Sequence, residues 1–491
     1  MAAGYADSAR IADMSDRRRN RFLAGVSGLL LIGLAACSNP AAEEPVAAPA
    51  PVAKAAPARP APAAPPEPVE PVIPGGLAGT FGAIETRSAD GFRMQQILLN
   101  RPELDGQRPV RVAVLVPLTG RAAGVGQRLL DAAMLAMFDQ QQPRLNLIPK
   151  DTQGTPEGAE QAARLALAEG AEVIVGPLFG NHVQVVNAVA EPAGVPVLAF
   201  SNDSAVAGRG AHILGVTPTN EVRSIIGFAL ARGHSKVAAF LPDSVYGRRV
   251  HQALVETMEQ SLGELVRVTY YPAGAEADDE LLLQYAREFA DYDLRKLALE
   301  EERARLESNG DAISKSALER LEVLDTLGDP PFDAVLLAEP ASRLPTIAPL
   351  LAFYDVDPVV ARYLGLGGWF ASDLQSEPTL IGGWFPGPDP TFYDSFASRF
   401  SATFGKDPDR IAMLGYDAIA LAATLIRDQS AGQPVFSDSA LLDDQGFAAY
   451  YGTFRLRPDG QSERLLPVLE VARDGLRVVG SPRQGFAPLL N

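Results

Sequence analysis

Residues 110–139 read VRVAVLVPLTGRAAGVGQRLLDAAMLAMFD, and this stretch decides the fold class. Valines stand at every second position from Val110 to Val116, in a short apolar run typical of a strand that is buried on both faces. A turn with three glycines follows, and apolar residues then recur at helical spacing from Leu129 to Phe138. Strand, turn and helix in this order predict the first unit of an open parallel α/β sheet.

The turn at residues 119–126 lies where sheets of this class bind ligands. Ligands gather outside the carboxyl ends of the strands, and the free backbone N–H groups at a helix start can donate to them. A turn of this kind also occurs in many α/β proteins of unrelated activity. The turn therefore predicts the place of a site and leaves its function open.

The alternation of strand and helix continues along the chain and then restarts. Further strands are predicted at residues 145–150, 172–175, 195–200 and 212–216. From Lys236 a second series is predicted at residues 236–241, 265–271, 332–338, 363–366 and 382–385. Repeated units of this length predict right-handed crossovers and a parallel sheet in each half. We therefore expect two α/β lobes.

The last part of the chain changes pattern. Two helices without a strand between them are predicted at residues 391–404 and 409–427, and a hairpin turning at Pro458-Asp459-Gly460 is predicted across residues 452–471.

Residues 281–328 form an insertion that breaks the alternation of strand and helix, because they are rich in Leu, Ala, Glu, Asp and Arg. Opposite charges four residues apart, such as Glu301 and Arg305, favour one or two long surface helices there. This insertion is either a solvated cap or a contact arm for another protein.

The composition excludes some classes of partner. The chain has 491 residues, of which 47% are hydrophobic and 21% are charged, as is ordinary for a globular protein of two or three domains. Its formal net charge of −17 argues against nucleic acid as a partner and against direct attachment to an anionic membrane surface. Any membrane association is therefore expected through a lipid anchor or a partner protein.

The N-terminal residues have the pattern of a secretion signal. A basic cluster at residues 17–21 precedes the apolar residues 22–34, which are too few for a membrane-spanning helix. The sequence LAAC at residues 34–37 resembles the lipobox of bacterial lipoproteins, which implies cleavage before Cys37 and acylation of that cysteine. Ser38 then implies sorting to the periplasmic side of the outer membrane of a Gram-negative bacterium. The alternative is that Cys37 is a buried thiol, and either Met1 or Met14 is the start.

Residues 38–109 are expected to form a linker. Its first part, residues 38–76, consists largely of Ala and Pro, a composition that favours extended, polyproline-like conformers over a packed core. At roughly 3.1 Å per residue, the forty residues richest in proline would reach on the order of 100 Å. The folded part is therefore expected to act well away from its anchor. Because Cys37 is the only cysteine, this chain can form no internal disulfide and no cysteine-based metal site.

Five short motifs together resemble the type 1 periplasmic binding proteins, in the branch that binds leucine, isoleucine and valine. They are VLVPLTG at 114–120, VGPL at 175–178, VPVLAFS at 195–201, DSVYG at 243–247 and GYD at 415–417. GPLFG at 176–180 and PVLAFSNDS at 196–204 are similar to penicillin-binding protein activator lipoproteins. The resemblance implies two doubly wound parallel-sheet lobes joined by a hinge. Lobe one would comprise residues 110–231 and 385–446, and lobe two residues 232–384 and 447–491, including the insertion.

The resemblance also implies which residues line the ligand cleft: Thr119, Gly120, Phe179, Gly180, Asn181, Ser201, Asn202, Asp203, Tyr246, Phe370 and Tyr416. Amino-acid receptors present hydroxyl groups and backbone N–H groups to the ligand carboxylate, because an anion needs donors. Here Phe179-Gly180-Asn181 replaces a Ser/Thr-rich turn, and Asp203 stands near the place of a donating Thr. A carboxylate ligand would be repelled by Asp203 unless Arg121 or another cation intervened. Asp203 therefore either receives a cationic or hydroxyl-bearing ligand or caps a helix.

The sequence favours a non-enzymatic role. Nucleophile-elbow, Walker and zinc-protease motifs are absent from it, and the four histidines lack ligand spacing, so we expect no catalytic residue, metal or cofactor. The first hypothesis is a regulator or adaptor of peptidoglycan synthesis that docks a peptidoglycan synthase, a penicillin-binding protein. The alternative is a substrate-binding protein of an ABC transporter, which hands an amino acid or another small polar ligand to a permease.

Overall fold

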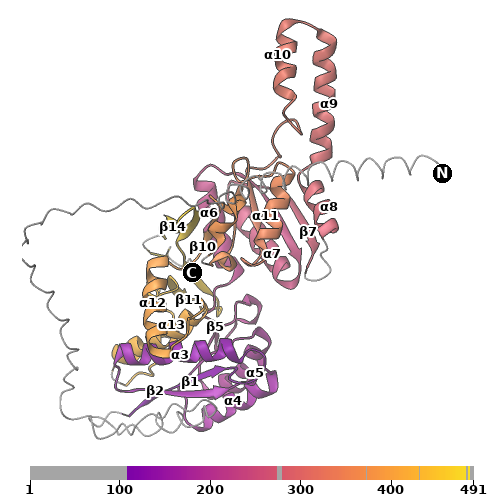
Figure 1. The fold of residues 1–491 in the computed structure, drawn as a ribbon. Coiled ribbons are helices and arrows are strands. Elements are labelled where there is room, and N and C mark those ends of the chain that lie inside the picture. Colours follow the sequence, from indigo (N-terminus) through magenta and orange to yellow (C-terminus); the bar gives the residue numbers. More distant parts are fainter. Residues whose placement is uncertain (1–107, 274–278, 372, 431, 483–484, 487–491) are drawn as a thin grey trace, which may run out of the picture. The chain divides into compact units, whose positions relative to one another are not determined.

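The computed structural model describes residues 108–273, 279–371, 373–430, 432–482 and 485–486 (Figure 1). The predicted signal peptide, the lipidation site Cys37 and nearly all of the linker at 38–109 lie outside the described residues. Within the described ranges, every helix is too short or too polar to cross a membrane.

The first sheet contains five parallel strands in the order β2-β1-β3-β4-β5. Their bounds are β1 Val110–Val116, β2 Leu145–Asp151, β3 Val173–Val175, β4 Val197–Ala199 and β5 Ala211–Ile213. The helices that connect them are α3 Ala123–Gln140, α4 Pro156–Ala168 and α5 Gly180–Ala190, with the 3-10 turns η1 Glu191–Ala193 and η2 Ser204–Val206.

Strand β1 shows why this sheet is covered on both faces. Its four valines point into a core shared with α3, whereas Ala113 and Leu115 point into a second core shared with α4 and α5. All these side chains are buried, as a strand with successive side chains on opposite faces requires when helices cover both. The predicted strand–turn–helix unit is thus the centre of the first sheet.

The second sheet has seven strands in the order β14-β13-β10-β9-β8-β6-β7. The five parallel strands are β6 Lys236–Asp243, β7 Glu264–Pro272, β8 Ala334–Leu337, β9 Arg362–Leu364 and β10 Trp384–Pro386. Two antiparallel strands, β13 Val468–Ala472 and β14 Gly475–Gly480, complete one edge. Helices α6 Pro218–Ala231 and α7 Val245–Glu259 share a core with one face, and α8 Asp279–Phe289 and α11 Leu344–Phe353 with the other. The predicted class, two doubly wound lobes with parallel sheets, is confirmed.

Two segments pack with a different lobe from the one expected. The chain reaches the second lobe before α6, because Val222, Ile225 and Ala229 of that helix lie in a core with β6. The hairpin of β11 Thr453–Leu456 and β12 Ser462–Leu465 turns at the predicted residues, yet its apolar side chains join the core of the first lobe. Its second strand ends at Leu465, because the rest of the predicted strand belongs to β13 in the second sheet. The same core holds α12 Pro390–Phe404, α13 Ala412–Arg427 and α14 Asp438–Leu441. In each segment the buried apolar face, rather than chain order, decides the lobe.

The insertion at 281–328 forms three helices. Helix α8 packs into the second lobe through Leu282 and Phe289, whereas α9 Tyr292–Asn309 and α10 Ala312–Leu321 form a helical hairpin that extends beyond the neighbouring helices (Figure 1). We call α9 and α10 the arm. The expected pairing of Arg305 with Glu301 is wrong, because the guanidinium bonds to Glu302, one residue closer, at 2.5 Å. Both spacings lie on one helix face.

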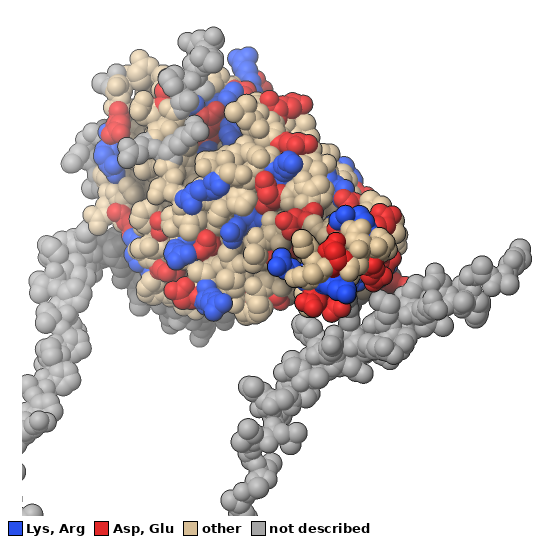
Figure 2. Space-filling model, turned by 90° about the horizontal axis from the view of Figure 1, so that it is seen from above, with Lys and Arg blue, Asp and Glu red and all other residues tan. Residues whose placement is uncertain are grey.

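One face of the molecule carries acidic and basic side chains of mixed distribution. On the face seen in Figure 2, red and blue residues are interspersed with tan ones, without a broad area of either sign.

Candidate ligand cavity

A cavity of about 760 Å³ lies at the carboxyl ends of strands from both sheets. Its volume is within the range of about 300–1,000 Å³ that is usual for small-molecule sites. The lining residues are Val125, Leu178, Phe179, Phe200, Asn202, Val216, Glu221, Pro242, Ser244, Tyr246, Ala273, Ala338, Glu339, Pro340, Arg343, Leu366, Gly368, Arg410, Ile411, Leu414 and Tyr451. The residues come from both lobes, so a ligand here would contact both.

One wall of the cavity is apolar. Leu178 and Phe179 follow β3, and Phe200 follows β4, so the ends of neighbouring strands bring these side chains together. Ile411 and Leu414, from the start of α13, add to the same wall. This surface suits the apolar part of a ligand.

A buried charged network lies at one end of the cavity. Glu221 accepts a hydrogen bond from the backbone N–H of Gly367 at 3.0 Å, and Arg410 donates to the hydroxyl of Tyr451 at 2.5 Å. Burial raises the pKa of the Glu221 carboxyl to about 7, although the charge of Arg410 and the Gly367 hydrogen bond act in the opposite direction. Glu221 therefore changes protonation near neutral pH. Burial also raises the pKa of Tyr246, which remains a neutral hydroxyl.

A second charged group is formed by Glu339 and Arg343, which follow β8, together with Tyr271 of β7. Tyr271 donates to Glu339 at 2.5 Å, and burial raises the pKa of Glu339 against the effects of that hydrogen bond and of Arg343. The Nη2 atom of Arg343 is buried and has no hydrogen-bond partner among the described residues. A buried donor without a partner is costly, so Arg343 offers a favourable place for an acceptor oxygen.

This cavity is lined by three of the residues that the resemblance implied, namely Phe179, Asn202 and Tyr246. Each follows the carboxyl end of a parallel strand, β3, β4 or β6. Their placement agrees with the rule that ligands bind beyond these ends.

Thr119 and Gly120 lie in the turn after β1 and do not border the cavity. The hydroxyl of Thr119 donates to Asp151 at 2.7 Å, and Gly120 has a positive φ of 79°. Burial alone would raise the pKa of Asp151, but the hydrogen bonds from Thr119 and from backbone N–H groups hold it below its usual value. These contacts fix the turn against the end of β2.

The carboxylate of Asp203 already has a hydrogen bond and an ion pair within the protein. It accepts from the N–H of Ala205 at 3.1 Å, which caps η2, and pairs with Arg249 at 2.6 Å. The hydroxyl of Ser201 accepts from the N–H of Asp203, and Gly180 packs so closely that a Cβ there would lie 3.0 Å from the same carboxylate. Asn181 follows in the first turn of α5. The intervening cation is Arg249 rather than Arg121.

Phe370 and Tyr416 also lie away from the cavity lining. Phe370 packs edge-to-face on Tyr393, with ring centroids 4.9 Å apart. Tyr416 of α13 donates to Asp139 of α3 at 2.8 Å, and its ring packs edge-to-face on Tyr450. A role for Tyr416 in packing the first lobe accounts for these contacts.

The charged residues of the cavity were not among the predicted ones. Glu339 directly follows the apolar strand β8, so the strand-end rule would have found it. Arg410 and Tyr451 are 41 positions apart, in segments that precede α13 and β11. Their meeting with Glu221 depends on long-range packing, and the sequence carries no local signal for it.

Comparison with known proteins places the chain in a family. Residues 109–475 match the family described as "Periplasmic binding protein". An uncharacterized protein of Rickettsia prowazekii is 24% identical over 172 residues, which are 35% of this chain and 46% of the relative. The penicillin-binding protein activator LpoA of Vibrio cholerae serotype O1 is 25% identical over 152 residues, 30% of this chain and 25% of the relative. The chain thus matches less than half of the length of these curated relatives.

Solved structures share the fold. A putative branched-chain amino acid ABC transporter protein from Rhodospirillum rubrum superposes with a TM-score of 0.56 at 16% identity, covering 76% of this chain and 100% of that one. The family match spans most of the chain, and the two parallel sheets agree with it. The chain therefore belongs to the periplasmic binding protein family, in its type 1, leucine-binding-protein-like branch.

Proposed function

We propose that this protein is a non-enzymatic regulator in the cell envelope that docks a peptidoglycan synthase of the penicillin-binding protein class. A lipid on Cys37 would hold it at the outer membrane, and the linker at 38–109 would let the folded part reach its partner. The observation that carries the proposal is the arm, a well-packed helical hairpin with exposed apolar side chains.

The arm is internally ordered. Leu299 and Leu306 are buried on α9, and Arg303 donates to the backbone carbonyl groups of Leu321 and Leu324 at 2.5 and 3.2 Å. An Asp311 side chain caps α10 by accepting from the N–H of Ser314 at 2.7 Å. The hairpin thus has its own packing and presents its outer faces to solvent.

The outer faces of the arm carry apolar residues. Leu294 and Leu297, three positions apart and hence neighbours on one face of α9, are 68% and 52% exposed, and Ile313 at the start of α10 is 83% exposed. Single exposed apolar residues are common on soluble proteins. Several on one projecting element are typical of a surface that contacts another protein.

The relatives and the cavity support the same proposal. The LpoA proteins of Vibrio are named as penicillin-binding protein activators, and the family's periplasmic location agrees with the secretion pattern of this chain. Asp203 is already paired with Arg249, and the donor-rich turn expected for an amino-acid carboxylate is replaced. These features favour docking over amino-acid capture.

The test uses matched surface variants of the full chain. Leu294→Ser, Leu297→Ser and Ile313→Ser are combined in one protein, and Leu262→Ser, Val359→Ser and Phe392→Ser, which are exposed elsewhere, in the control. We expect the arm variant to bind a purified peptidoglycan synthase of the same organism about tenfold more weakly, a loss of about 1.4 kcal/mol, and to lose its stimulation of glycan polymerisation. The control should keep both. Equal binding and stimulation by the two variants would contradict the proposal.

A second candidate function rests on the 760 Å³ cavity, whose apolar wall and charged end suit a small amphipathic ligand. In this case the protein is the substrate-binding component of an ABC transporter and delivers its ligand to a permease. A ligand present at about 100 times its Kd would stabilise the folded state by about 2.7 kcal/mol. A screen of amino acids and small polar solutes by melting temperature would detect such a shift, and its absence across the screen would remove this candidate.

A further inference from the structure

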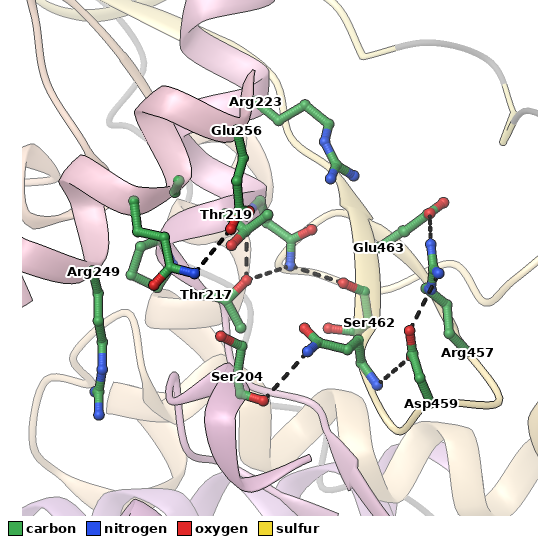
Figure 3. Close-up of a pocket in the computed structure, with 15 residues that line it drawn as sticks. Ser204, Thr217, Thr219, Arg223, Arg249, Glu256, Arg457, Asp459, Ser462 and Glu463 are labelled. Carbon is green, nitrogen blue, oxygen red and sulfur yellow. Dashed lines mark hydrogen bonds and ion pairs between the residues drawn. The ribbon is translucent and has the colours of Figure 1, made fainter. Parts of the chain in front are cut away.

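A second, smaller cavity of about 300 Å³ lies beside the start of α6 (Figure 3). Helices α6 and α7 form one side, and the turn of the β11–β12 hairpin forms the other. Ser204 of η2 contributes a third side from the first lobe. None of the residues predicted from the resemblance lines it. This smaller cavity is therefore distinct from the 760 Å³ cavity, and its walls come from both lobes.

The hairpin wall is held firmly in place. The backbone N–H of Ile213 donates to the carbonyl of Gly460 at 2.8 Å, and Asn220 donates to the carbonyl of Ser462 at 3.1 Å. Gly460 has a φ of 79°, and a Cβ there would lie 2.4 Å from the carbonyl oxygen of Ala211. Only glycine allows this approach, so the cavity is built into the fold and does not depend on a loose surface loop.

Several hydrogen-bond donors at this cavity are left without acceptors. Ser462 is 6% exposed, and its hydroxyl has no hydrogen-bond partner among the residues the structure describes. The Nε atom of Arg457 is also buried and has no hydrogen-bond partner among these residues. Arg223, on α6, is an exposed side chain that lines the cavity and has neither an ion pair nor a hydrogen bond to another described residue. A buried donor without a partner is costly, so Ser462 and Arg457 offer favourable places for an acceptor oxygen.

The acidic residues around the cavity are largely neutralised by the protein. Glu463 pairs with Arg455 at 2.6 Å and with Arg457 at 2.8 Å, and Arg457 also pairs with Asp459 at 3.2 Å. Glu256 is the exception, because its hydrogen bond comes from the neutral amide of Gln252, at 2.9 Å. The hairpin side of the cavity thus offers donors, and the α7 side offers one carboxylate.

We propose that this cavity binds a small hydrophilic molecule that carries an oxyanion, either a carboxylate or a phosphate. The oxyanion accepts hydrogen bonds from Arg223 and Ser462, near the positive end of α6. The body of the molecule directs hydroxyl or amine groups toward Glu256, since a second negative charge would be repelled there. The volume, at the lower end of ligand sites, suits a molecule of about the size of one sugar.

The site gives the protein a means of regulation beyond docking. Its walls come from η2 in the first lobe and from α7 in the second, so an occupied site favours the arrangement of lobes in which those walls face each other. This inference stands independently of the arm and of the identity of the docked partner.

The test is isothermal titration of the full chain with inorganic phosphate, glucuronate and glucose at constant ionic strength. We expect both anions to bind and glucose to give no heat. Arg223→Gln and Ser462→Ala should each weaken anion binding at least about tenfold, whereas the control Arg164→Gln, on the exposed face of α4, should leave it unchanged. Because Ser462→Ala removes an unsatisfied buried hydroxyl, its melting temperature should not fall.

Two results would overturn the inference. The first is that neither anion binds, or that both bind with the same affinity in the Arg223→Gln and Ser462→Ala variants. The second is that Arg343→Gln, in the larger cavity, abolishes binding while Arg223→Gln does not. The arm variant described above should bind the anions normally, so failure of this inference is distinguishable from failure of the docking proposal.

Discussion

Glu221 makes the stability of the protein depend on pH in a predictable way. Burial raises the pKa of its carboxyl from the ordinary 4.5 to about 7 in the folded protein. The folded state therefore holds a proton that the unfolded chain releases, and stability is lost as the pH rises through this interval. At 1.36 kcal/mol for each pKa unit, the loss is about 3 kcal/mol in full and roughly 2–3 kcal/mol between pH 5 and pH 8.

The substitution Glu221→Gln isolates this contribution. The amide oxygen can still accept from the N–H of Gly367, and the side chain no longer titrates. Urea denaturation of both proteins at pH 5 and pH 8 gives four unfolding free energies. The wild type should lose roughly 2–3 kcal/mol more than the variant over this range. An identical pH dependence in the two proteins would refute the reasoning, because it would mean that Glu221 is not protonated in the folded state.

Four core and helix substitutions test the packing. Leu129→Ala removes a side chain that is 0% exposed and should cost about 2–5 kcal/mol in urea denaturation, whereas Leu165→Ala, 49% exposed, should cost less than about 0.5 kcal/mol. Gly126→Ala would place a Cβ 1.8 Å from the carbonyl oxygen of Pro117 and should prevent stable folding, as judged by the loss of a cooperative melting transition. Gly227→Ala has open space on α6 and should raise the unfolding free energy by about 0.5–1 kcal/mol.

The sequence predicted the fold well where the signal was local and repeated. The valines of β1 and the helical spacing after the turn form the centre of the first sheet, and the hairpin around Pro458-Asp459-Gly460 is present. The lobe assignment of α6 and of the hairpin was less predictable. Both are amphipathic, and periodicity shows that a face is buried without showing which core receives it.

The lining of the larger cavity was predicted only where strand ends supply it. Phe179, Asn202 and Tyr246 follow parallel strands and line the larger cavity. The sequence leaves two roles open for Asp203, which are to receive a cationic or hydroxyl-bearing ligand or to cap a helix. Only the position of Arg249, on a helix of the other lobe, distinguishes between them. Distances between residues so far apart in sequence follow from tertiary packing and have no local pattern in the chain.

The central claim is that the arm contacts a peptidoglycan synthase in the envelope. The most direct measurement places a photo-crosslinking amino acid at Ile313 in the full chain, irradiates living cells and identifies the linked protein by mass spectrometry. A position exposed elsewhere, Val359, serves as the control. We expect Ile313, and not Val359, to become linked to a penicillin-binding protein. A link from Ile313 to an ABC permease subunit, or none to a peptidoglycan synthase, would contradict it.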